Sequence, residues 1–337
     1  MRISPFMIFN QLASSMKDSL KIYAQLNEQL ASGKKINRPS DDPMGMARSL
    51  DYRLNISSND QYKKNIDAGA IRLNITEVNL DSASATLANI QHTISLSLNS
   101  SADQAARDGY STAIAQNRND LFSFANATFN NQYLFSGFRT DQQAYTAGPA
   151  YAYQGDAGVM NVRIDQNMAV PVNVRGDEAF SLTMIAPEVR QISGGKFVHY
   201  TPQAGTTTID VEIRDTNDTT VLDTFSFSNA MQMTDQLSSA IKTNDSDRVR
   251  ALSVMFDRMS SQVHSVQAEV GTRLSLLSDQ SQRLQSLTSN ITQALETTEN
   301  ANPVEITAGL KTVDVTLQAL RESASRVLSQ SLMDFLK

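Results

Sequence analysis

The chain has 337 residues and a formal net charge of −6, and it contains three histidines but no cysteine and no tryptophan. Without cysteine it can form no disulfide, no thiolate nucleophile and no cysteine-ligated metal centre. The acidic balance lacks the surplus of Lys and Arg that neutralises phosphates, so we expect no nucleic-acid partner. No window approaches about 18 consecutive apolar residues, and the first residues lack a continuous apolar segment. We therefore expect neither a membrane span nor a cleaved secretory signal.

Glycine and proline divide the chain into three zones. Residues 46–130 contain two glycines, residues 234–302 contain one, and neither stretch contains proline. Helix interiors exclude both residues, because Gly costs about 1 kcal/mol and Pro about 3 kcal/mol relative to Ala. Residues 137–205, in contrast, hold eight of the 14 glycines and four of the eight prolines. This distribution predicts long helices, a turn-rich middle, and long helices again.

Apolar residues in the outer zones recur at alternating steps of three and four. Two long seams of this kind run through residues 73–94 and 249–284. Such sustained spacing is typical of coiled-coil packing rather than of a compact globule. We expect the segments 73–94 and 249–291 to bury their seams within the chain.

Two shorter seams lie near the chain ends, in residues 6–30 and 304–336. Short amphipathic helices are marginal alone and need a partner that buries the apolar stripe. We therefore expect these two segments to assemble with neighbouring subunits, in preference to folding back on their own chain. The predicted assembly residues are Phe9, Leu12, Met16, Tyr23, Leu26, Leu30, Leu310, Val313, Leu317, Leu320, Val327 and Leu332.

Residues 31–43 are predicted to connect two helices. Asp42 followed by Pro43 is typical of an N-cap and the first helical position, and Pro39 prevents a helix from continuing through the segment. Gly33 suits the residue after a helix end, and Asp41 adds negative charge at the start of the next helix. The predicted connector motif consists of Gly33, Arg38, Pro39, Asp41, Asp42 and Pro43.

The middle of the chain changes to a period of two. Residues 160–165, 169–175 and 208–214 alternate apolar and polar side chains, and Gly-Asp and Gly-Gly pairs separate such segments. This pattern predicts an antiparallel β domain. Asn217 and Asp218 are predicted to form the tip of a hairpin between two strands.

These patterns together predict an α+β fold. The expected architecture is elongated, with a long coiled-coil helical rod built from both terminal regions and an antiparallel β domain inserted in the middle. The expected domains are an assembly helix with connector (1–43), the N-terminal half of the rod (44–135), a variable β-rich outer domain (136–230), the C-terminal half of the rod (231–300) and a C-terminal assembly helix (301–337).

Few residues suggest chemistry. The histidines are far apart and outside metal-binding patterns, so we assign no catalytic residue, no metal site and no cofactor. A remote alternative is a hydrolase of cell-wall glycan, which needs two carboxylates about 5–10 Å apart. Asp156, Asp177 and Glu178 would be its candidates, although the Gly-Asp context of both aspartates indicates turns.

Four segments resemble the flagellin superfamily. They are residues 1–4 (MRIS), 26–43 (LNEQLASGKKINRPSDDP), 131–138 (NQYLFSGF) and 267–274 (QAEVGTRL). The resemblance covers both terminal zones, about two-thirds of the chain. The form of the connector, with Arg38, Pro39 and Pro43, is more similar to the hook-associated members than to flagellin itself. A flagellin that forms the filament stays an alternative.

The resemblance implies a structural protein of the bacterial flagellum with no enzymatic activity. Members of this kind are exported unfolded through the flagellar type III apparatus and form a ring that joins the hook to the filament for motility. The implied partners are copies of the same chain, hook-associated protein 1 and flagellin. A cytoplasmic export chaperone would bind the C-terminal segment before the protein is secreted.

Overall fold

The structure is a computed structural model and describes residues 5–98 and 103–335. The chain forms two compact units. Met1–Gln61 together with Arg283–Lys337 make up the terminal unit, and Tyr62–Gln282 make up the central unit. Long helices near both ends of the sequence and antiparallel strands in its middle confirm the predicted α+β class.

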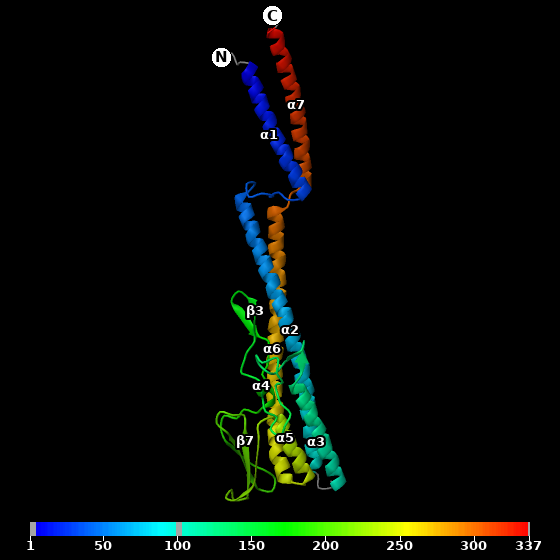
Figure 1. Cartoon of the computed structure of the whole chain (residues 1–337), viewed down its shortest axis with the longest axis vertical. Helices are drawn as coiled ribbons and strands as arrows, with labels where there is room; N and C mark the ends of the chain where they lie inside the picture. Colours follow the sequence, from blue (N-terminus) through cyan, green and yellow to red (C-terminus); the bar gives the residue numbers. More distant parts are fainter. Residues whose placement is uncertain (1–4, 99–102, 336–337) are drawn as a thin grey trace. The chain divides into compact units, whose positions relative to one another are not determined.

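Helices dominate both units, as Figure 1 shows. The two longest, α2 and α6, have 55 and 54 residues, so each is on the order of 80 Å long at 1.5 Å per residue. Within the described residues, no helix combines the length and the hydropathy needed to cross a membrane. The helices are α1 (Pro5–Ser32), α2 (Pro43–Ser97), α3 (Gln104–Ala125), α4 (Gly176–Phe180), α5 (Ala230–Lys242), α6 (Ser246–Glu299) and α7 (Pro303–Phe335).

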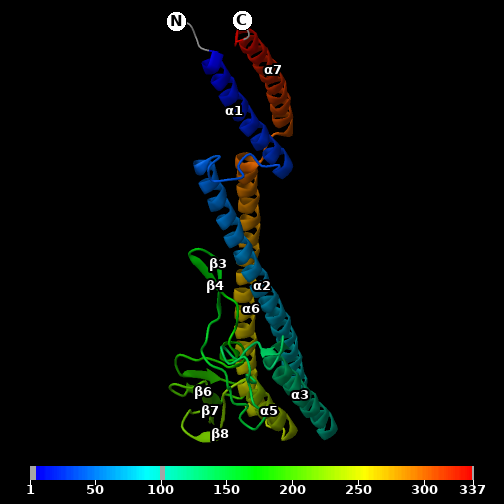
Figure 2. The ribbon, with the colours of Figure 1, turned by 45° about the horizontal axis from the view of Figure 1, so that its top comes forward.

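The predicted internal seams form the helical core of the central unit. All seven seam positions of α2 from Leu73 to Ile94 are buried, each no more than 3 % exposed. Along α6 the seam is buried at Val249, Leu252, Phe256, Met259, Val263, Val270 and Leu277. Gln91 of α2 donates a hydrogen bond to Asp257 of α6 over 2.9 Å, and the two helices lie side by side (Figures 1 and 2). The intramolecular packing predicted for these segments is confirmed.

Two shorter helices, α3 and α5, pack against each other in the central unit. The Arg118 side chain of α3 forms an ion pair with Asp235 of α5. α5 is separate from α6, although no glycine or proline lies between them. Asn244 adopts a left-handed conformation with φ of 58°, and Asp245 then caps α6 by accepting a hydrogen bond from the Arg248 N–H over 3.0 Å. The segment 231–300, predicted as the C-terminal half of the rod, therefore contains most of α5 and all of α6.

The strands form three antiparallel sheets. β1 (Thr128–Phe129) pairs with β2 (Gln132–Tyr133), and β3 (Asn161–Asp165) pairs with β4 (Met168–Pro171). The third sheet has the order β5-β6-β7-β8, and Figure 2 labels three of its strands, β6, β7 and β8. Its strands are β5 (Glu188–Gln191), β6 (Phe197–Pro202), β7 (Ile209–Arg214) and β8 (Val221–Phe227).

The alternation predicted for β7 places one face of the strand in the core. Ile209, Val211 and Ile213 are each 1 % exposed, whereas the polar residues between them are half-buried. The predicted hairpin tip is present, with Asp218 at a φ of 58° between β7 and β8. β4 is shorter than the strand predicted over 169–175, since it ends at Pro171.

Candidate assembly site

In the terminal unit, α1 and α7 lie side by side and run in opposite directions (Figures 1 and 2). Gly309 of α7 permits a close approach, since a Cβ atom there would lie 3.2 Å from Cδ1 of Leu26 on α1. Leu317 of α7 is 4 % exposed. Each helix thus covers part of the seam of the other.

The predicted assembly residues are covered to different degrees within the chain. Leu317 is buried, and Leu12, Met16, Leu26, Leu310, Val313 and Leu320 are half-buried. Phe9, Tyr23 and Leu30 stay exposed. Val327 and Leu332 lie outside the residues whose side chains the structure describes. Within the single chain, α1 packs on α7. The sequence pattern favours contact with neighbouring subunits over this folding back. Contact of these residues with other subunits stays a prediction.

The terminal unit exposes an unusual share of its apolar side chains. It carries 13 of the 23 large apolar side chains that are exposed among the described residues, but only four of the 47 buried apolar ones. Sequence reasoning missed several, because they lie off the predicted seams. They are Leu20, Ile22, Met44, Leu50, Leu54, Val304 and Val315. A concentration of exposed apolar side chains in one unit is compatible with an interaction surface.

The connector between α1 and α2 has the caps that its sequence predicts. Gly33 follows the last residue of α1 with φ of +69°, a conformation that favours glycine after a helix end. α2 begins at Pro43, and Oδ1 of Asp42 accepts a hydrogen bond from the Gly45 N–H over 2.9 Å. Asp42 is therefore the N-cap of α2.

Asp41 has a role beyond the predicted one. Its Oδ2 accepts hydrogen bonds from the backbone N–H groups of Asn37 and Arg38, over 3.1 and 2.9 Å, so it stabilises the turn that precedes α2. Its effect on the start of α2 stays a prediction. The Arg38 side chain forms an ion pair with Glu28 of α1 at 3.0 Å. Pro39 lies within this turn.

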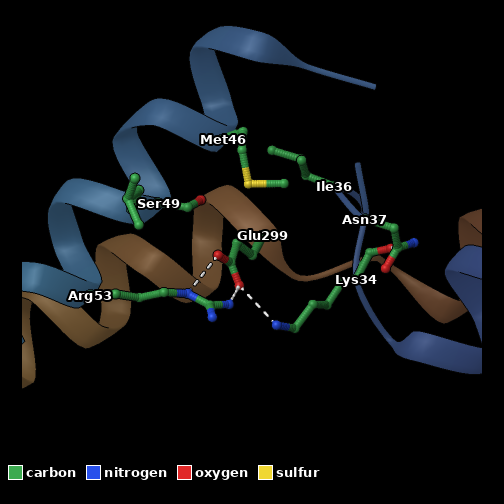
Figure 3. A pocket seen from close by; sticks show the side chains of 8 residues that line it. Lys34, Ile36, Asn37, Met46, Ser49, Arg53 and Glu299 are labelled. Carbon is green, nitrogen blue, oxygen red and sulfur yellow. Dashed lines mark hydrogen bonds and ion pairs between the residues drawn. The ribbon is translucent and has the colours of Figure 1, made fainter. Parts of the chain in front are cut away.

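The end of α6 forms hydrogen bonds with the connector. The Lys35 N–H donates to the Glu299 carbonyl over 2.6 Å, and the Ala301 N–H donates to the Gly33 carbonyl over 3.0 Å. The Arg53 guanidinium forms two hydrogen bonds with the Glu299 carboxylate, over 3.1 and 2.6 Å (Figure 3). Lys34 lies 3.2 Å from the same carboxylate. One acidic side chain thus links the connector, α2 and α6.

The charge of Glu299 is stabilised in the fold. Burial raises the pKa of its carboxyl group, but the hydrogen bonds and positive charges of Arg53 and Lys34 outweigh that effect, so the pKa lies below its ordinary value. No motif in the sequence signals this trio, because Arg53 and Glu299 are 246 residues apart in the chain.

The carboxylates considered for glycan hydrolysis make structural contacts. Oδ1 of Asp156 accepts hydrogen bonds from the N–H groups of Phe138 and Gly158, over 2.8 and 2.9 Å. Asp177 and Glu178 both form ion pairs with Arg175, at 3.2 and 2.8 Å. Within the described part of the chain, no group of three or more His, Asp or Glu side chains could hold a metal ion.

Known flagellar proteins resemble this chain in sequence and in fold. Residues 3–140 match the family model described as the bacterial flagellin N-terminal helical region. The chain is 24 % identical over 181 residues to flagellar hook-associated protein 3 of Escherichia coli K12, and 24 % identical over 182 residues to that of Salmonella typhimurium. These alignments cover 53 and 54 % of this chain, and it spans 57 % of the length of each relative.

Solved structures show the same fold. A putative flagellar hook-associated protein from Vibrio parahaemolyticus is 21 % identical, with a TM-score of 0.59 over 77 % of this chain and 99 % of that one. The flagellar junction protein FlgL from Legionella pneumophila is 14 % identical, with a TM-score of 0.55 over 76 % of this chain and all of the other. The resemblance to the flagellin superfamily is confirmed. Within it, this chain resembles hook-associated protein 3.

Proposed function

We propose that this protein is a structural component of the bacterial flagellum that joins the hook to the filament. The observation that carries the proposal is the imbalance of the terminal unit, which carries 13 of the 23 exposed large apolar side chains among the described residues but only four of the 47 buried apolar ones. Such a unit gains stability when neighbouring subunits cover it. The names of the matched relatives, flagellar hook-associated protein 3 and flagellar junction protein, support the junction as its place.

In this proposal, copies of the chain form a ring through their α1 and α7 helices, with hook-associated protein 1 on one side and flagellin on the other. A cytoplasmic chaperone holds the C-terminal segment until the type III apparatus exports the chain. The absence of cysteine is compatible with an export route that has no disulfide step. The proposed location is extracellular, at the hook–filament junction.

The proposed role is structural and not catalytic. The three carboxylates that are candidates for a glycan hydrolase are engaged in a turn and in ion pairs. Incubation of the purified protein with peptidoglycan should release no soluble fragments, and released fragments would contradict this part of the proposal.

Immunogold labelling of intact flagellated cells tests the location. We expect label confined to the proximal end of each filament. Label along the whole filament would instead identify a flagellin, and the absence of label from flagella would overturn the proposal altogether.

The double variant Leu317→Asp, Leu320→Asp tests the terminal helices. Two charges on the α7 seam should prevent incorporation into flagella while the central unit stays folded, because burying an unpaired carboxylate is strongly unfavourable. The matched control is Thr316→Asp, Gln318→Asp, which places the same charges at exposed positions of α7. Motile cells with normal flagella that contain the Leu317, Leu320 double variant would contradict the proposed assembly.

A further inference from the structure

The central unit presents one aromatic side chain to solvent. Phe138 is 61 % exposed, and among the residues described in this unit it is the only aromatic one with a largely exposed side chain. A Cβ atom at Gly158 would lie 2.3 Å from Cδ2 of Phe138, so the ring lies directly on the glycine. The N–H groups of both residues donate to Oδ1 of Asp156, over 2.8 and 2.9 Å. The unit therefore holds the exposed ring in place by itself.

A fixed and exposed aromatic ring has the properties of a binding anchor. Aromatic side chains bury a large apolar area, and they are enriched among the residues that dominate interfaces. Since the Phe138 ring already rests on Gly158, little side-chain freedom is lost when it docks. The next residue, Arg139, is exposed, donates one hydrogen bond to the Gln154 carbonyl over 3.3 Å, and forms no ion pair with a described residue. The anchor is thus an apolar knob beside an unpaired positive charge.

The surface that receives such a knob should be a hole on an exposed helix face. In knobs-into-holes packing, one side chain inserts among four residues of a facing helix, and apolar residues recur every seven positions. Two pairs of exposed large apolar residues have this spacing on the described helices. Ile71 and Val78 of α2 are 50 and 65 % exposed, and Tyr23 and Leu30 of α1 are 38 and 41 % exposed.

The charges beside the two pairs distinguish them. Asp67 precedes Ile71 by four residues and Asp81 follows Val78 by three, so both carboxylates lie on the same face of α2 as the apolar pair. Both aspartates are exposed, and neither forms an ion pair with a described residue. The corresponding positions beside the α1 pair hold a serine and a glycine. Only the α2 pair therefore complements a knob that carries a positive charge next to it.

We propose that Phe138 of one copy inserts between Ile71 and Val78 of a neighbouring copy, with its Arg139 facing the flanking aspartates. Within one chain these apolar residues do not cover each other, because each is at least half exposed. The inference rests on the proposed function, since it requires neighbouring copies. The two surfaces differ, so the contact is heterologous and suits a ring. It joins central units, in addition to the proposed assembly through α1 and α7.

Disulfide formation between two tagged copies tests the contact. The chain has no cysteine, so cells that express Phe138→Cys with one tag and Asn74→Cys with another contain only these two thiols in this protein. Asn74 is exposed and lies between Ile71 and Val78 in the chain. After mild oxidation of isolated flagella, we expect a dimer that carries both tags. The matched control pairs Phe138→Cys with Asn27→Cys, which lies between the two residues of the α1 pair.

The second test measures how firmly the protein is held. Phe138→Ala should be released from diluted, isolated flagella about tenfold faster than the wild type, because lost interface contacts act mainly on dissociation. Arg139→Glu should lower the amount recovered in flagella, and added Asp67→Lys and Asp81→Lys changes should restore it. Ile185→Ala, at a position of the central unit that is 99 % exposed, is the control and should behave like the wild type. The isolated variants should melt at the wild-type temperature, since all these positions are exposed.

The outcomes separate this inference from the proposed function. If the wild type is recovered in flagella, but Phe138→Ala is released like the wild type or no dimer with both tags forms through Asn74→Cys, the contact is overturned and the junction role is not affected. A dimer through Asn27→Cys would place the knob on α1 and overturn the assignment to α2. If the wild type is absent from flagella, the proposed function itself fails.

Discussion

The Glu299 carboxylate is nearly buried, yet it holds two cations from other segments of the terminal unit. Its pKa is lowered in the fold, so its contribution to stability is fully present above its ordinary pKa of 4.5 and is lost as the pH falls through the lower folded value. We expect Glu299→Gln to destabilise the terminal unit at pH 7 by about 1 kcal/mol, a small effect because both cations are partly exposed to solvent.

Thermal unfolding between pH 7 and pH 3 measures this contribution. The difference in stability between the wild type and Glu299→Gln should be constant near neutral pH and shrink below pH 4.5. Glu296→Gln is the control, since Glu296 is exposed on the same helix. A pH-independent difference would show that the ion pairs are not the cause.

The N-cap of α2 depends on a single side chain. Asp42→Ala removes the acceptor of the Gly45 N–H and should cost about 1 kcal/mol. Hydrogen exchange at the Gly45 amide should accelerate more than exchange in the middle of α2. Ser40→Ala, in the adjacent turn, should leave both rates unchanged, and equal acceleration along the whole helix would contradict a local capping role.

Residues differ in how far the sequence predicts their roles. The caps Gly33 and Asp42 could be predicted, because a cap depends only on residues a few positions away. The hydrogen bonds of Asp41 to the turn could not be predicted, since the sequence does not fix which nearby N–H group a carboxylate will meet. The pairing of Arg53 with Glu299 had no local signal, because it depends on how two distant helices meet.

Two glycines in the long helices of the central unit should respond oppositely to the same substitution. A Cβ at Gly271 of α6 would meet nothing within 4 Å, so Gly271→Ala should stabilise the unit by about 0.5–1 kcal/mol through helix propensity. A Cβ at Gly69 of α2 would lie 2.8 Å from Cγ1 of Val172, so Gly69→Ala should destabilise it by about 1 kcal/mol or more. Chemical denaturation of both variants measures the difference, and the same sign for both would contradict this packing.

At the level of elements, predictability follows the periodicity of the pattern. The seam of α2 could be predicted because seven successive apolar positions keep the alternating steps of three and four residues. Strand β7 could be predicted because its alternating apolar residues face the core. The separation of α5 from α6 could not be predicted, because neither helix contains Gly or Pro near the break. Only Asn244 and Asp245 mark it. The sequence does not determine whether α1 pairs with α7 of its own chain or with another subunit, because an amphipathic stripe does not specify which helix covers it.

At the scale of the whole molecule, the two units should differ in stability. The central unit contains 43 of the 47 buried apolar side chains among the described residues, and the terminal unit only four. Because apolar burial is the main favourable contribution to folding, we expect the terminal unit of the isolated protein to unfold first. Brief trypsin treatment should therefore remove segments of 1–61 and 283–337 and leave a resistant fragment within 62–282.

Mass spectrometry of the fragments and scanning calorimetry check this expectation together. Calorimetry of the full chain should show two transitions, and the lower one should be absent from the resistant fragment. In isolated flagella the terminal segments should resist trypsin, because neighbouring subunits would cover their exposed apolar side chains. Equal protection of both units in the free protein would mean that α1 and α7 are stable without partners. The case for assembly through these helices would then lose its physical basis.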